Sequence, residues 1–136
     1  MAAYRYLDHT ADLGIEITGR TRKQLFINAG RAIFETQVRG PVAAGREIRF
    51  ALAADSLADL FIEWCRELLY RFAVRGFIPR RYDLELEGLR LRAALKGDIF
   101  DPKRHAVKLE IKNPTYHRLK VEKRPDGYRA TIVFDV

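Results

Sequence analysis

Residues 57–72 read LADLFIEWCRELLYRF, and this stretch determines the fold more clearly than any other part of the sequence. Its apolar side chains recur every three or four residues and form one stripe on an α-helix: Leu57, Leu60, Phe61, Trp64, Cys65, Leu68, Leu69 and Phe72. Asp55 or Ser56 can cap the start of this helix, and Gly76 suits its end. Because Cys65 lies on the stripe, we interpret its thiol as a core group rather than a reactive one.

A second amphipathic helix is predicted upstream. After Thr21, apolar residues recur with helical spacing at Leu25, Phe26, Ala29, Ala32 and Ile33. Thr21 and Gln24 have the spacing of a capping box, and Gly40 followed by Pro41 is a signal that ends a helix. Each of the two helices therefore needs an apolar surface to pack against.

The remaining sequence alternates between apolar and polar residues, which predicts strands with one buried face. The alternating segments are residues 13–17, 47–52, 84–86, 89–95, 107–111 and 128–134. Pro125-Asp126-Gly127 predicts a turn between the last two strands. Since such alternation favours antiparallel pairing, we expect an α+β fold, a mainly antiparallel or mixed sheet with two amphipathic helices packed on it.

The composition sets wider limits. The chain has 136 residues, which predicts a single domain over residues 1–136, and 48% of them are hydrophobic, enough for a core. No run approaches the roughly 18 apolar residues of a membrane span, and residues 1–8 lack the apolar core of a signal peptide. We therefore expect a cytoplasmic protein with no membrane partner. One cysteine excludes an internal disulfide.

The net charge of +7 is concentrated in one part of the chain. Residues 103–124 contain eight Lys or Arg against two Glu. This excess indicates either a polyanionic partner or a solvated strand face, and charge alone does not separate the two.

Asp8-His9-Thr10-Ala11-Asp12 is the densest polar cluster near the start of the chain. Two carboxylates and an imidazole within five residues can bind a metal or perform acid–base chemistry. The alternative is a polar turn, because Asp and Thr side chains commonly bond nearby backbone groups.

A second acidic position lies at the other end, where Asp135 precedes Val136. Only oxygen ligands are offered there, which suits Ca²⁺ or Mg²⁺, and the alternative is a solvated acid in a frayed end. Cysteine is too scarce for a structural zinc cluster, and His9, His105 and His117 lack the HxxxH spacing of a catalytic zinc site.

The sequence lacks the common catalytic motifs. It has no GxxxxGK[ST] or GxGxxG phosphate loop and no GxSxG nucleophile elbow. Its only serine, Ser56, is better explained as a helix cap than as a nucleophile. We therefore expect that the protein is not an enzyme and assign no catalytic residue.

Taken in order, these segments resemble the archease family across nearly the whole chain. The resemblance rests on YRYLDHTADLGI at 4–15, the helix at 21–34, EWCRELLY at 63–70, EIK at 110–112, TYH at 115–117 and FDV at 134–136. The chain departs from the family at Asn113-Pro114. Because proline removes a ladder donor, this position must be a sheet edge, a bulge or a strand start.

The resemblance implies a chaperone-like α+β protein that assists the GTP-dependent, tRNA-splicing RNA ligase. Such a protein promotes guanylylation of the ligase, allows multiple turnover and relaxes its nucleotide preference. The ligase is the expected partner, and indirect contact with tRNA or RNA is a further expectation. The resemblance also implies a bound divalent metal, Ca²⁺, held by Asp12, Asp135 and the terminal carboxylate or carbonyl oxygen of Val136. A divalent ion would convert the mutual repulsion of these acids into attraction.

Four further residues are lesser candidates. His9 would orient the loop that holds Asp12, and Asp8 belongs to the same cluster. Lys112 can meet a phosphate or an acidic partner, or it is an ordinary surface lysine. His117 we interpret as structural.

Three other functions remain open. The basic residues 103–124 suggest a direct RNA- or tRNA-binding module, although aromatic residues do not interleave with them. A chaperone for another RNA-modifying enzyme would show the same sequence features. A metal-dependent hydrolase using Asp8, His9 and Asp12 is the weakest alternative, because no nucleophile or phosphate cradle accompanies these residues.

Overall fold

The computed structural model describes residues 3–7 and 12–136. Its elements in chain order are β1 (Tyr4–Leu7), β2 (Leu13–Gly19), α1 (Arg22–Gln37), β3 (Val38–Arg39), β4 (Arg46–Ala53), α2 (Leu57–Arg75), β5 (Phe77–Glu87), β6 (Arg90–Ile99), β7 (Ala106–Val107), β8 (Asn113–Arg124) and β9 (Gly127–Asp135). Within these residues, neither helix is long and apolar enough to span a bilayer.

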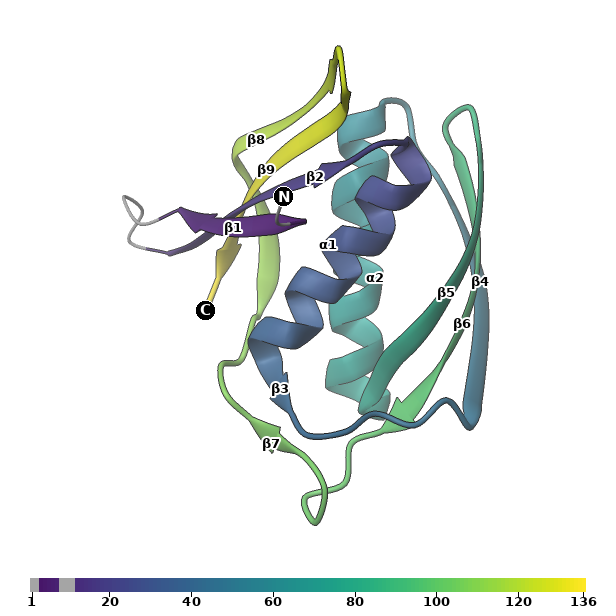
Figure 1. Ribbon diagram of the computed structural model, residues 1–136, viewed down its shortest axis with the longest axis vertical. Coiled ribbons are helices and arrows are strands. Elements are labelled where there is room, and N and C mark those ends of the chain that lie inside the picture. The colour runs from purple at the N-terminus through teal and green to yellow at the C-terminus, as the bar shows by residue number, and fades with distance from the viewer. Residues whose placement is uncertain (1–2, 8–11) are drawn as a thin grey trace.

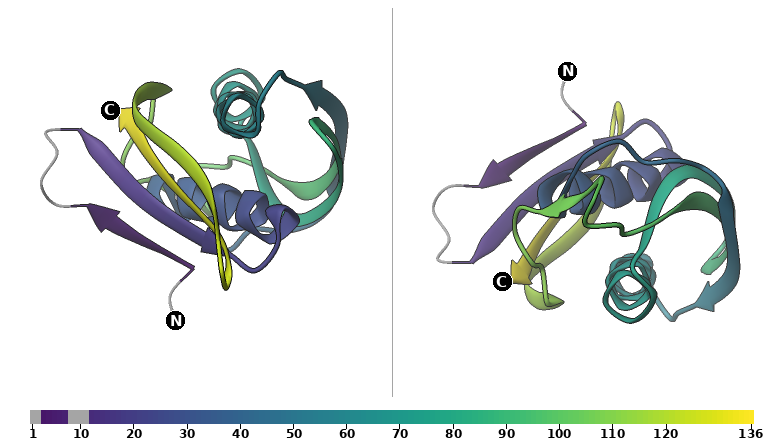
Figure 2. Two further views of the ribbon diagram at one scale, coloured as in Figure 1. Left: turned by 90° about the horizontal axis from the view of Figure 1, so that it is seen from above. Right: turned by 90° about the horizontal axis from the view of Figure 1, so that it is seen from below.

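Every strand pair in the described residues is antiparallel, and the α+β fold class is confirmed. The strands do not form one continuous sheet. They divide into a four-stranded sheet of order β1-β2-β9-β8, a three-stranded sheet of order β4-β6-β5, and the short pair β3-β7. The two helices lie between the larger sheets (Figure 1), and the three-stranded sheet curves around α2 (Figure 2).

Helix α2 begins and ends where its sequence predicts. The Ser56 side chain accepts a hydrogen bond from the Asp59 N–H at 3.1 Å, so Ser56 rather than Asp55 is the N-cap. Gly76 caps the other end in the left-handed region, at φ 69°, and its N–H donates to the Phe72 carbonyl at 2.8 Å.

Helix α1 forms half of the predicted capping box. The Thr21 side chain accepts from the Gln24 N–H at 3.0 Å, but the Gln24 side chain donates to Asn28 Oδ1 at 2.8 Å instead of returning to the cap. The helix ends at Gln37, before the predicted Gly40–Pro41 stop, because Val38 already begins β3.

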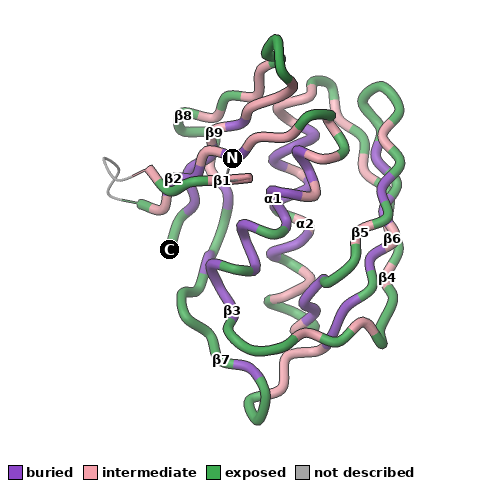
Figure 3. Tube along the Cα trace, in the orientation of Figure 1, coloured by how far each residue is buried: buried purple, intermediate pink, exposed green. Residues whose placement is uncertain are grey.

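The core is centred on Trp64, which is fully buried on α2. Its indole N–H donates to the Phe26 carbonyl on α1 at 2.8 Å, and its ring contacts those of Phe50 and Tyr82 from the three-stranded sheet. Figure 3 shows buried residues along the helices and at positions of the strands on both sides of them. Cys65 is also fully buried, and this burial raises the pKa of its thiol, which confirms the core interpretation.

One predicted strand is wrong over most of its length. Of the predicted strand at 107–111 only Val107 lies in a strand, in the short β7, and the chain after it is irregular. Its amides are paired elsewhere, since the Lys108 N–H donates to the Gln37 carbonyl at 2.7 Å and the Ile111 N–H to Gln37 Oε1 at 3.1 Å. The end of α1 therefore satisfies groups that a neighbouring strand would otherwise pair.

The departure at Asn113-Pro114 has the expected explanation. These two residues begin β8, which is an edge strand of the four-stranded sheet. A proline at such a position removes no hydrogen bond that the sheet requires.

Gly30 is buried in the interior of α1, where glycine ordinarily costs stability. A Cβ at this position would lie 2.6 Å from Cε2 and 2.8 Å from the hydroxyl oxygen of Tyr82. We expect Gly30→Ala to lower the free energy of unfolding by about 1–2 kcal/mol, because displacing a packed ring outweighs the better helix propensity. Urea denaturation of single and double variants measures this. In a Tyr82→Ala background the same substitution should be neutral or stabilising, and an equal loss in both backgrounds would contradict the explanation.

Candidate functional site

Pairing of β2 with β9 brings two predicted acidic ligands to one end of the four-stranded sheet. The terminal pair of this ladder is Leu13 with Phe134. Asp12 directly precedes β2, and Asp135 directly follows Phe134 at the end of β9, so the antiparallel register brings both acids to the same end of this ladder. Both are exposed. Acids from opposite ends of the sequence therefore converge.

The edge strand β8 adds Lys112 to this end of the sheet. Asn113 pairs with Asp135, and the Lys112 N–H donates to the Asp135 carbonyl at 2.8 Å. Lys112 is exposed, as is Val136, which follows Asp135. The predicted candidates Asp12, Lys112, Asp135 and Val136 thus meet at one place, whereas Asp8 and His9 lie outside the described residues.

The donor atoms at this end suit a hard cation. Two carboxylates and the main-chain oxygens of Val136 are all oxygen ligands, which Ca²⁺ and Mg²⁺ prefer. Within residues 3–7 and 12–136, no group of three or more His, Cys, Asp or Glu side chains could hold a metal ion. Among the described residues, a cation here could be bound by Asp12, Asp135 and a main-chain oxygen, and these few ligands would leave coordination positions for other oxygens.

His117 lies in an irregular part of β8. Thr115 pairs with Val133 and Lys120 with Thr131, so residues 116–119 stand opposite Ile132 alone. Arg118 adopts a positive φ of 59°, a conformation that costs energy in a residue other than glycine. His117 is exposed in this bulge.

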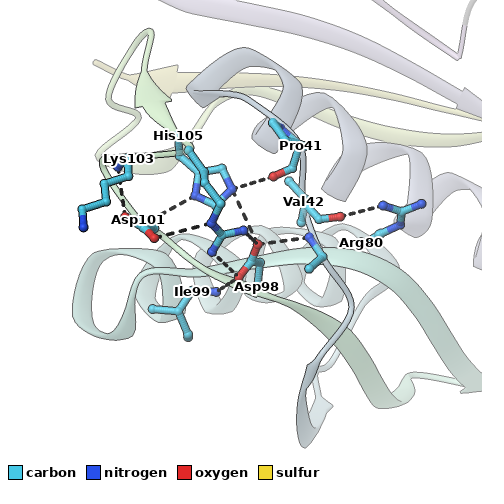
Figure 4. A network of polar contacts seen from close by, with 10 residues as sticks. Pro41, Val42, Arg80, Asp98, Ile99, Asp101, Lys103 and His105 are labelled. Atoms are coloured by element: carbon cyan, nitrogen blue, oxygen red, sulfur yellow. Dashed lines mark hydrogen bonds and ion pairs between the residues drawn. The ribbon is translucent and has the colours of Figure 1, made fainter.

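A network of polar contacts that the sequence analysis did not predict lies at the end of β6 (Figure 4). Asp98 accepts hydrogen bonds from the Arg104 guanidinium at 2.7 and 3.2 Å, from the Ala43 N–H at 3.0 Å and from the Ile99 N–H at 2.8 Å. These donors, the guanidinium above all, hold the pKa of the Asp98 carboxyl well below its usual range. Asp98 is therefore an ionised acid fixed inside the fold.

His105 completes this network and is buried. Its Nδ1 accepts from the Asp101 N–H at 3.0 Å, which leaves the proton on Nε2. Nε2 donates to the Pro41 carbonyl at 2.7 Å and lies 3.6 Å from Asp98 Oδ2. Both ring nitrogens are occupied, so His105 is not available as a metal ligand. The network ties the segment after β3 to the segment after β6.

Comparison with known proteins identifies a family model and several full-length chains that match this sequence. The model of the Archease protein family matches residues 4–136. "Protein archease" of Methanosarcina acetivorans is 34% identical over 98% of this chain and 95% of its own length. The protein of the same name from Pyrococcus abyssi is 31% identical over the full length of both chains.

Two solved structures have the same fold. The solution structure of Methanobacterium thermoautotrophicum protein 1598 matches with a TM-score of 0.81 and 21% identity over 100% of both chains. The crystal structure of a Thermotoga maritima protein described as "an archease, possible chaperone" matches with a TM-score of 0.68 and 24% identity, over 96% of this chain and 94% of that one. Both likenesses concern the fold.

The Asp98 network predicts a specific dependence of stability on pH. Because the pKa of Asp98 is lower in the folded state than the value of about 3.9 of an unfolded chain, its ionised form stabilises the fold above that pH. This contribution is lost as the pH falls below about 4. We therefore expect Asp98→Asn to have a lower free energy of unfolding than the unsubstituted protein at neutral pH. This difference in free energy should become smaller in acid.

Urea denaturation between neutral and acidic pH tests this prediction. Asp126→Asn, at an exposed turn between β8 and β9, is the matched control and should show almost no such difference at any pH. A difference for Asp98→Asn that stays constant with pH would contradict the assignment of an ionised, bonded carboxylate.

Proposed function

The chain belongs to the archease family, and from this premise we propose that it is an accessory protein that activates a GTP-dependent, tRNA-splicing RNA ligase. Activation would consist of promoting guanylylation of the ligase and multiple turnover, with RNA met through the ligase. The relatives carry the name archease, and the Thermotoga maritima structure is described as a possible chaperone. None of these names states a reaction, which agrees with the expectation that the chain is not an enzyme.

The observation that carries the proposal is the convergence of Asp12 and Asp135. The register of β2 with β9 brings these two exposed acids to one end of the sheet, where their like charges favour a nearby cation. We propose that these residues, with an oxygen of Val136, hold Ca²⁺. The ion would supply positive charge and open coordination positions at the end of the sheet, where an oxygen of the ligase or its nucleotide can bind.

Lys112 would add a second charge to the same surface. Its main chain is bonded to Asp135, and its side chain is exposed. An ammonium group at this place can bind a phosphate or a carboxylate of the partner beside the acids. Residues 8–11 adjoin Asp12 in sequence, so Asp8 and His9 stay candidates for supporting it.

The decisive experiment mixes the protein with its cognate ligase and GTP and counts covalent guanylate on the ligase. The unsubstituted protein should raise the guanylylated fraction, and Asp12→Ala should abolish this increase, because the variant loses one of two carboxylates. Asp126→Ala is the control and should activate normally, because this exposed acid lies in the turn beside Gly19, at the end of β2 opposite to Asp12. Circular dichroism should show both variants folded.

Calorimetric titration with Ca²⁺ tests metal binding independently of ligase activation. Asp12→Ala and Asp135→Asn should each weaken Ca²⁺ binding by about tenfold or more, since affinity follows the number of charged ligands. Full activation by Asp12→Ala, or no increase in guanylate with the unsubstituted protein, would contradict the proposed function.

A second candidate function is direct binding of RNA. The bulge at residues 116–119 leaves Tyr116 58% exposed, and Arg118 and Lys120, which follow it in the same strand, are exposed as well. If this surface binds single-stranded RNA, affinity without any ligase should fall steeply with salt, and Tyr116→Ala should weaken it through lost stacking. Filter binding at several salt concentrations measures this, and affinity that is undetectable at low salt excludes the candidate.

A further inference from the structure

A cavity of about 270 Å³ lies between α1, the segment after β3 and the first part of β5. Its polar lining comes from Arg31, Glu35, Arg80 and the Tyr82 ring, and aliphatic and aromatic side chains such as Phe34 and Ile78 form the rest. None of these residues belongs to the acidic end of the four-stranded sheet. The cavity is therefore a separate feature from the proposed metal site.

Helix α1 lines the cavity with one stripe. Arg31, Phe34 and Glu35 follow the spacing i, i+3 and i+4, which brings them to one face of the last turns of the helix, and Val38 adds to this wall from the start of β3. The opposite wall is the segment from Gly40 to Val42.

Three side chains hold this opposite wall in place. The Arg80 guanidinium donates to the Val42 carbonyl at 2.6 Å, and Asp98 and His105 bond the neighbouring Ala43 N–H and Pro41 carbonyl (Figure 4). Burying a carboxylate and an imidazole is costly unless their partners are fixed. Here the buried groups hold a short segment without helix or strand in one position, so the wall and Arg80 are already arranged before any ligand arrives.

The charges that line the cavity favour an anion. Two guanidinium groups stand against one carboxylate, and the Glu35 carboxylate already accepts a hydrogen bond from the Tyr4 hydroxyl. Burial raises the pKa of Tyr82, so its hydroxyl stays protonated. The net charge of +7 attracts anions to the whole surface as well.

We propose that this cavity binds a small organic anion, with a carboxylate or phosphate group between Arg31 and Arg80 and an apolar body against the inner wall. Guanidinium groups bind both kinds of head group through paired hydrogen bonds. The volume falls just below the range of about 300–1,000 Å³ common for small-ligand pockets, which suits a single ring rather than a nucleotide. This site goes beyond the proposed function and does not depend on it.

Nuclear magnetic resonance of the ¹⁵N-labelled full chain tests the proposal with matched probes. N-acetyl-L-phenylalanine and phenyl phosphate each combine a ring with an anionic group, and comparing them separates carboxylate from phosphate. N-acetyl-L-phenylalanine amide lacks the charge, and acetate lacks the ring. We expect saturable shifts at Gly40 and Val42 with at least one of the two ring-bearing anions, with a Kd of about 1 mM, the affinity expected for ligands of this size.

Variants then assign the binding to the cavity. Arg31→Gln should weaken binding of the probe with the higher affinity by about tenfold, since Arg31 is exposed and its contact with the head group is charge-assisted. Lys23→Gln removes the same charge from the first turn of α1, outside the cavity, and should leave binding unchanged. Equal binding of the amide and the acid, equal affinity in Arg31→Gln, or the lack of saturable shifts with both anions would each overturn the proposal.

Discussion

The pairing of β2 with β9 is the constraint on which both the fold and the proposed site depend. Ile15 pairs with Ile132 and Ile17 with Ala130, and all four side chains are fully buried against the helices. A slip by one residue would turn this apolar face to solvent, so hydrophobic packing fixes the register. The positions of Asp12 and Asp135 follow from that register. Two acids that repel each other are thus held together by the apolar residues beside them.

Local sequence patterns predicted the local structure correctly. The observed structure differs from the prediction where contacts between distant segments determine the conformation. The period of 3.6 residues and the caps at Thr21, Ser56 and Gly76 predicted both helices, because these signals act within a few turns. The division into separate sheets was not predictable, since strand order depends on packing between distant segments. The strand predicted at 107–111 was wrong because Gln37, distant in sequence, pairs its amides.

The same distinction between local and long-range information applies to the candidate site. The acids at 12 and 135 were singled out by residue type and by resemblance, whereas their adjacency is a property of the ladder. The burial of Asp98 and His105 was not predictable, because a buried polar residue has the same sequence signature as an exposed one. The cavity beside Arg31 and Arg80 is a property of three segments together, so no single stretch of sequence indicates it.

The carboxylates of this protein have two different physical roles. Asp98 is buried and bonded to Arg104, and Glu122 is bonded to Arg129, so each belongs to the stability of the fold. Asp12 and Asp135 are exposed, at the end of the sheet where a partner can reach them. A cation site needed only for folding would be expected inside the molecule, enclosed by its ligands. An exposed pair of acids is better suited to an ion whose remaining coordination positions are filled by a partner.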